Sequence, residues 1–137
     1  MNHILLIPIC LALSACSMTY HAVPHAPAEE AAWFKFPQAF PEQGRQVIPS
    51  TVASAIQLAM DDFLPRGASP SLGSTPLQAC LLQRASYDVM AASGSEGVMF
   101  VSIFLSPGAC LMTGPVLDAG ALYAVDVRAW RVLAIQR

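Results

Sequence analysis

Thiols and imidazoles are the side chains of this chain with the clearest capacity for chemistry. Cys80 and Cys110 can pair as a disulfide, remain free thiols, or supply half of a metal site, and His21 and His25 have the i, i+4 spacing of a helical metal pair. A metal site needs more ligands than either pair provides, and no CxxC motif occurs. Pro24 also disfavours a helix that would align the two histidines. We therefore predict exposed histidines and neither a metal nor a cofactor.

Carboxylates give no stronger indication of catalysis. Asp61 and Asp62 are adjacent, so on a helix their side chains diverge by about 100° and do not face one site. The other candidates are single carboxylates in or beside expected strands: Asp88, Asp118 and Asp126. No GxSxG, HExxH, Walker or GxGxxG motif is present. We predict no catalytic residues; the alternative is a hydrolase, which requires the aspartates to converge in one cleft.

The N-terminus carries the most specific pattern. An apolar run over residues 4–13 ends at Leu13, and Ser14, Ala15 and Cys16 follow it. The run has the length of a signal-peptide core, with small residues before the cleavage point, and is too short to span a bilayer. This pattern resembles the lipobox of bacterial lipoproteins. The resemblance covers residues 1–16 and implies that residues 1–15 are a signal peptide and that Cys16 becomes the lipidated first residue.

Lipidation fixes the expected location of the chain. Lipoproteins of this kind carry a diacylglycerol on the cysteine thiol and an acyl chain on its amine, and two or more chains are needed for stable anchoring. Membrane lipid, held through Cys16, is thus the first expected partner. The residue after Cys16 is Ser17. In Gram-negative sorting, an aspartate at this position implies retention at the inner membrane. The resemblance therefore implies the periplasmic side of the outer membrane.

Composition limits what the exported part can be. Removal of 15 residues from the 137 leaves enough chain for one ordinary domain. The net charge of −2, without a basic run, argues against nucleic acid as a partner. Charged residues make up only 12% of the chain, which leaves apolar surface for a protein partner. Cys10 lies in the expected signal peptide and Cys16 is the expected lipidated residue, which leaves Cys80 and Cys110. Two remaining thiols usually pair in an oxidising compartment, so a disulfide between them is the favoured prediction.

An aromatic segment lies between the expected tether, residues 16–32, and the first clear helix. Its rings are Trp33, Phe34, Phe36 and Phe40, interrupted by prolines. We expect an extended arm whose rings cover the core, because aromatic side chains dominate core burial. The alternative is an exposed patch, centred on Trp33, Phe34 and Phe36, that binds a partner or touches the membrane interface.

The remaining elements predict one domain over residues 33–137. Residues 52–63 have a 3- to 4-residue apolar spacing typical of a helix, which Ser50 or Thr51 can cap. Alternation predicts a strand that begins near residue 80 and ends near residue 91, followed by a hairpin loop at residues 93–97. Residues 98–105 are almost continuously apolar, which predicts a central strand covered on both faces. Residues 110–112 are expected to resume the sheet.

The C-terminal residues predict a closing hairpin. Residues 121–127 alternate and can pair with residues 132–135 across a turn that contains Arg128, Trp130 and Arg131. This trio can bind a partner through stacking and charge, although a solvated hairpin end is the favoured reading. The run resembles the closing hairpin of PepSY-type and other cystatin-like envelope domains, with Trp130 where a turn glycine is common.

These elements predict an α+β domain with one helix packed on a four- to five-stranded antiparallel sheet. Since no nucleophile, base and orienting group are assembled, we expect a non-catalytic binding or accessory lipoprotein that holds an envelope protein. An envelope hydrolase and a purely structural envelope protein are the alternatives.

Overall fold

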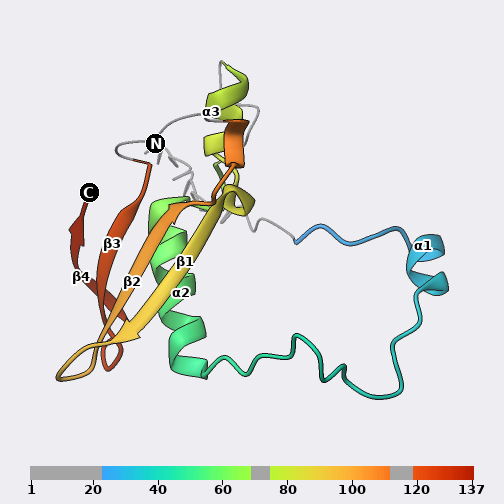
Figure 1. Ribbon diagram of the computed structural model, residues 1–137, viewed down its shortest axis with the longest axis horizontal. Coiled ribbons are helices and arrows are strands. Elements are labelled where there is room, and N and C mark those ends of the chain that lie inside the picture. Colours follow the sequence, from blue (N-terminus) through green and yellow to red (C-terminus); the bar gives the residue numbers. More distant parts are fainter. Residues whose placement is uncertain (1–22, 69–74, 112–118) are drawn as a thin grey trace, which may run out of the picture.

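A four-stranded antiparallel sheet forms the centre of the molecule. The computed structural model describes residues 23–68, 75–111 and 119–137. The strands are β1 (Tyr87–Ser93), β2 (Val98–Leu105), β3 (Ala121–Asp126) and β4 (Arg131–Gln136), and they pair in sequence order. The predicted α+β class is therefore confirmed, and the sheet has the lower of the two predicted strand numbers, four (Figure 1).

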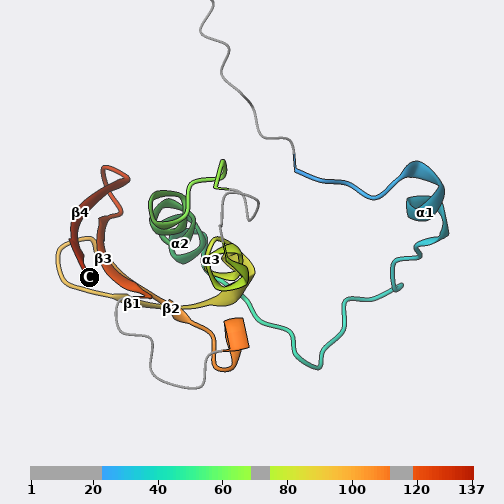
Figure 2. The ribbon, with the colours of Figure 1, turned by 90° about the horizontal axis from the view of Figure 1, so that it is seen from above.

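Helix α2 (Ser50–Phe63) packs across one face of this sheet (Figure 2). Its side chains Ala55 and Ala59 are fully buried, and their small size lets the helix approach the strands closely. Val52, Ile56 and Phe63 pack against the same core, so the predicted apolar spacing is confirmed, whereas the predicted cap is not. Pro49 occupies the N-cap position, and neither Ser50 nor Thr51 makes a side-chain capping hydrogen bond.

The inner face of the sheet supplies the other half of the core. Alternate residues of β2 and β3 point toward α2 and are buried: Met99, Val101, Ile103, Ala121, Tyr123 and Val125. The opposite residues of β2 are at least partly accessible. The expectation that β2 is covered on both faces is therefore wrong, because both described α-helices beside the sheet, α2 and α3, lie on the same side of it (Figure 2).

Helix α3 (Pro76–Leu81) occupies the place where the predicted first strand was expected to begin. Thr75 caps it by accepting a hydrogen bond from the Gln78 N–H at 3.2 Å, and Pro76 fits the first turn, where no N–H donor is needed. A 3₁₀ turn, η2 (Arg84–Ser86), then leads into β1. The strand consequently begins at Tyr87 rather than near residue 80.

The predicted disulfide is present. Cys80 and Cys110 are bonded, which joins α3 to the 3₁₀ turn η3 (Ala109–Leu111). Because Cys110 and Leu111 both have positive φ, these residues turn the chain rather than resume the sheet. Residue 112, the end of that predicted strand segment, lies outside the described residues.

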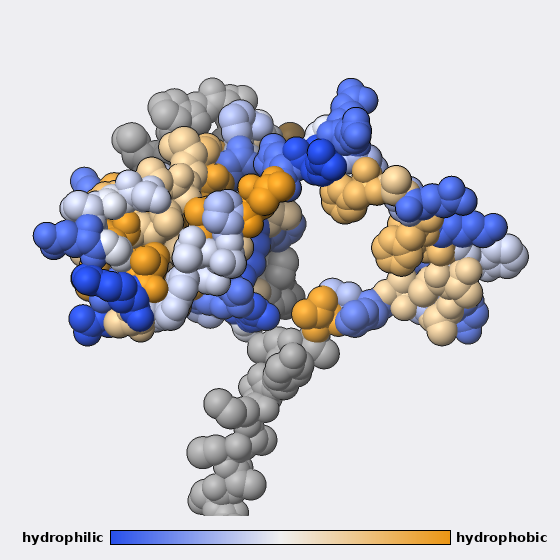
Figure 3. Space-filling view, turned by 90° about the horizontal axis from the view of Figure 1, so that it is seen from below, coloured by the Kyte–Doolittle hydropathy of each residue, from blue (hydrophilic) through white to orange (hydrophobic). Residues whose placement is uncertain are grey.

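Residues 23–49 contribute no buried side chain. They contain α1 (Ala28–Trp33), a short helix that lies mostly within the expected tether, residues 16–32. The aromatic rings that follow do not cover the core, so the favoured sequence interpretation of this segment is wrong. Figure 3 shows these residues as an arm that stands apart from the packed body.

Candidate functional site

The outer face of the sheet exposes several large apolar side chains to solvent. Strand pairing places Met90 and Leu122 on either side of Ser102, and Phe100 between Ala92 and Ala124. Exposure reaches 61% for Met90, 44% for Phe100 and 38% for Leu122. Large apolar side chains grouped at such exposure are typical of interaction surfaces.

A shallow hollow of about 480 Å³ lies within this face. Its lining comes from β1, β2 and β3: Met90, Ala91, Ala92, Phe100, Ser102 and Leu122. Ser102 contributes one hydroxyl to an otherwise apolar wall, so the hollow fits an apolar side chain better than a charged group. Gly94 helps to place the Phe100 ring, since a Cβ at Gly94 would lie 2.7 Å from that ring.

Sequence reasoning missed this surface. The apolar run of residues 98–105 was interpreted as doubly buried because aromatic and aliphatic residues occupy both of its faces. The small residues opposite Phe100 on both neighbouring strands, Ala92 and Ala124, were the available signal. They leave the ring without a large neighbour directly opposite it on either adjacent strand.

The predicted C-terminal trio lies in and beside the β3–β4 turn, where two of its members have partners within the chain. Asp126 accepts hydrogen bonds from the N–H groups of Arg128 and Ala129 at 2.9 and 3.1 Å. These backbone bonds, followed by the nearby arginine charges, hold the pKa of Asp126 below its ordinary value. Arg131 lies 3.6 Å from the same carboxylate.

Trp130 and Arg128 complete this hairpin end. Trp130 has a φ of 50°, a left-handed conformation in the position where related patterns have glycine, and its ring is exposed. A Cβ at Gly97 would lie 2.9 Å from Arg128 Nε, so this arginine lies over the β1–β2 loop. The Val127 N–H also donates to the Gly97 carbonyl at 2.9 Å. The Val127 hydrogen bond and the Arg128 side chain thus join the two neighbouring hairpin ends, whereas Arg131 pairs within its own hairpin.

The aromatic arm forms a second apolar surface. A hollow of about 620 Å³ is lined by residues of the arm alone: His25, Ala26, Glu30, Ala31, Trp33, Phe34 and Phe36. Phe34 and Phe36 contact each other edge to face, with ring centroids 5.1 Å apart. All three rings predicted as a partner-binding patch therefore stay accessible.

The aspartates do not form a common site among the described residues. Asp61 and Asp62 point to different partners, Asp88 lies on the outer face of β1, and Asp126 lies at the far hairpin. Asp118 lies outside the described residues. Neither hollow is lined by an aspartate, and the described residues contain no group of three potential metal ligands.

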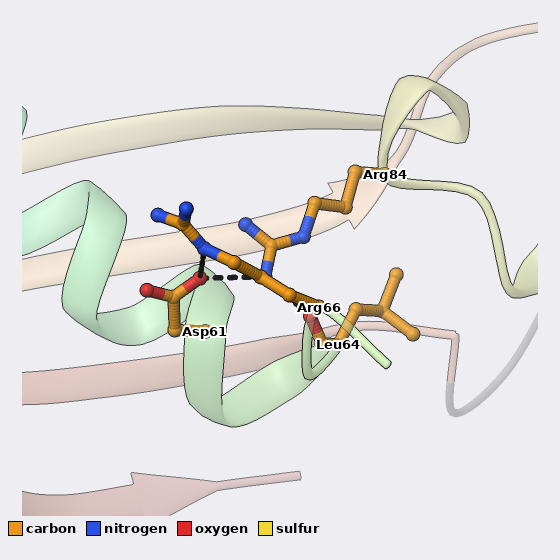
Figure 4. A network of polar contacts seen from close by, with 4 residues as sticks. All are labelled: Asp61, Leu64, Arg66 and Arg84. Carbon is orange, nitrogen blue, oxygen red and sulfur yellow. Dashed lines mark hydrogen bonds and ion pairs between the residues drawn. The ribbon is translucent and has the colours of Figure 1, made fainter. Parts of the chain in front are cut away.

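A network around Asp61 has a structural role instead (Figure 4). Arg84 donates from Nη2 to Asp61 Oδ1 and to the Leu64 carbonyl, both at 2.6 Å, and Arg66 Nε lies 3.3 Å from the same carboxylate oxygen. Desolvation alone would raise the pKa of Asp61, but the two arginines hold it below its ordinary value. Arg84 therefore ties the C-terminal end of α2, where positive charge is favourable, to the start of β1.

Replacement of Arg84 by methionine should lower the free energy of unfolding by about 1 to 2 kcal/mol, because it removes two charge-assisted hydrogen bonds. Arg66→Met is the matched control and should cost less than about 0.5 kcal/mol, since its ion pair is longer and exposed. Urea unfolding at neutral pH measures both. Equal losses in the two variants would contradict the bridging role of Arg84.

Comparisons with models of known families, with characterised proteins and with solved structures find no match to this chain. The residues that carry the lipoprotein resemblance, including Cys16, lie outside the described part. Within the described part, no helix has both the length and the apolarity that crossing a membrane requires.

Proposed function

We propose that this protein is a lipid-anchored envelope lipoprotein whose domain is a non-catalytic binding module for an envelope protein. The observation that carries the proposal is the accessible apolar hollow around Phe100, Met90 and Leu122 on the outer face of the sheet. An apolar side chain of a partner gains burial there, and the Ser102 hydroxyl can hydrogen-bond a polar group of the partner beside it.

The anchor rests on the lipobox-like pattern that ends at Cys16. Attachment through this residue would hold the domain at the periplasmic side of the outer membrane, as Ser17 favours. A helix packed across an antiparallel sheet of four strands is also compatible with the cystatin-like or PepSY-like architecture that the closing hairpin resembles. We infer that the anchor at Cys16 holds the domain near a membrane while the outer face of its sheet stays open to a partner.

Site-specific photo-crosslinking in intact cells tests the binding surface. A photoreactive amino acid in place of Ser102 should join the protein to a discrete envelope protein, because this position lies inside the hollow. The matched control carries the same group in place of Gln57, an exposed residue of α2. Phe100→Ser, added to the protein that carries the photoreactive group at position 102, should reduce the crosslinked product about tenfold. This is the loss expected for one buried aromatic contact.

The same products from Ser102 and Gln57 would contradict a specific sheet-face site. The anchor is tested separately by the intact mass of protein extracted from membranes, with Cys16→Ala as the control. A lipidated mature mass that Cys16→Ala abolishes supports the anchor, whereas an unlipidated full-length mass would overturn it.

A further inference from the structure

The aromatic arm exposes more ring surface than any other segment of the described chain. Its rings are accessible to 82% at Trp33, 67% at Phe34, 86% at Phe36 and 75% at Phe40. Such a group of apolar side chains is unfavourable in water, and monomeric soluble proteins rarely leave one uncovered. Either a protein surface or a lipid surface is therefore needed to cover it.

The packed body does not supply that cover. Every residue from 23 to 49 is exposed, and the closest ring contact of the arm is the one between Phe34 and Phe36. Beyond Trp33 the backbone leaves the helix, and Pro37 and Pro41 lack the N–H needed to add the arm to a sheet edge as a regular strand. The rings consequently face solvent along a short, irregular segment.

The direction of the chain indicates what lies near the rings. Trp33 follows Cys16 by only 17 residues, so the chain between them can reach roughly 60 Å at most. On the C-terminal side, residues 41–49 connect the arm to α2 and are all exposed, so the position of the arm is not fixed by packing against the body. If lipid holds Cys16, the rings stay within reach of the bilayer, and their binding to it becomes an intramolecular event.

The charges of the arm fit neutral lipid headgroups. Lys35 is the only charged residue among residues 33–40, and Glu30 and Glu42 lie on either side of this stretch. Tryptophan and phenylalanine favour the membrane–water interface, where the indole N–H stays hydrated while the rings are buried. An acidic surface is not required, because the arm lacks the basic cluster that binds anionic lipids.

We propose that residues 33–40 insert their rings into the interfacial layer of the bilayer that anchors Cys16. This inference rests on the proposed lipoprotein function. It adds a second attachment, through Trp33, Phe34, Phe36 and Phe40, that places the domain close to the membrane surface instead of at the end of a free tether.

Tryptophan fluorescence of the lipidated protein tests the insertion. The chain has two tryptophans, so Trp130→Phe leaves Trp33 as the only reporter and Trp33→Phe leaves Trp130 as the matched control. Both proteins are purified from membranes and reconstituted into phosphatidylcholine vesicles that contain lipids brominated on their acyl chains. Trp33 should be quenched by the bromines and protected from aqueous acrylamide, whereas Trp130 should be quenched by acrylamide alone.

The outcomes separate this inference from the proposed function. Trp33 quenching that the Phe34→Ser, Phe36→Ser double substitution abolishes supports the insertion. Protein that floats with the vesicles while Trp33 remains open to acrylamide keeps the anchor and overturns the insertion. Trp33 that is shielded from acrylamide without bromine quenching is covered by protein, which also overturns it. If the mass shows no lipid on Cys16, the anchor fails, and bromine quenching of Trp33 in added vesicles still decides the insertion.

Discussion

Removal of the Cys80–Cys110 disulfide is expected to lower the free energy of unfolding by about 3.5 kcal/mol. The bond closes a loop with a sequence separation of 30 residues, and a constraint of that size restricts the unfolded chain by this amount in the loop-entropy model. A domain of this size with about 10 kcal/mol of stability would lose a third of it. Urea unfolding of the Cys80→Ser, Cys110→Ser double variant measures the effect.

Chemical reduction of the unmodified protein supplies the control for this experiment. Dithiothreitol should shift its unfolding midpoint to that of the double variant, because both treatments open the same loop. The double variant itself should not respond to the reductant. A double variant that unfolds at the same urea concentration as the oxidised protein would show that the bond constrains nothing beyond what α3 and η3 already hold.

Truncation of Tyr123 to alanine is expected to cost about 3 to 5 kcal/mol, the range measured for large buried aromatic residues. Tyr123 has no exposed surface and lies at the centre of the sheet, where it pairs with Val101 and Ile135. Its hydroxyl donates a hydrogen bond to Asp62 Oδ2 at 3.0 Å. Tyr123→Phe keeps the ring and removes this bond, so it should cost only about 1 kcal/mol. Equal losses in the two variants would mean that the hydroxyl, not the ring, stabilises the core.

The same hydroxyl predicts a loss of stability at high pH. Burial, together with the hydrogen bond and charge of Asp62, raises the pKa of Tyr123 to about 12. The unfolded tyrosine releases its proton near pH 10, so the folded state binds more protons between about pH 10 and 12 and is progressively destabilised there. Tyr123→Phe should flatten this part of the unfolding free energy profile. Burial also raises the pKa of Tyr87, so part of the slope should persist.

Local patterns predicted most of the sheet. Alternation in residues 121–127 and the glycine-containing loop after Ser93 are local signals, and both correspond to observed strands and turns. The disulfide also followed from composition, because only two cysteines remain after the lipobox. For the strand and the loop, a short stretch of chain contains the physical cause of the structure.

Signals that depend on distant residues were harder to interpret. One local signal was also missed: Thr75 and Pro76 begin α3, whereas the predicted strand, which began near residue 80, overlaps only the end of this helix. The exposure of Phe100 depends on which side of the sheet α2 covers, and the small residues Ala92 and Ala124 indicate it only once the strand pairing is known. The fate of the aromatic arm likewise depends on what it meets outside the body. Sequence therefore predicted the aromatic candidates but not the sheet-face site.

The strand order has a consequence for how the chain reaches its native state. Each strand pairs with the strand next to it in sequence, β1 with β2, β2 with β3 and β3 with β4. Sheets of this kind have low contact order, and they fold faster than sheets that bring distant segments together. Individual hairpins form in about 1 to 10 μs. If the chain is exported unfolded, as the proposed anchor requires, such a meander shortens the interval in which its apolar strands are open to aggregation, before the slower oxidation of the thiols completes the fold.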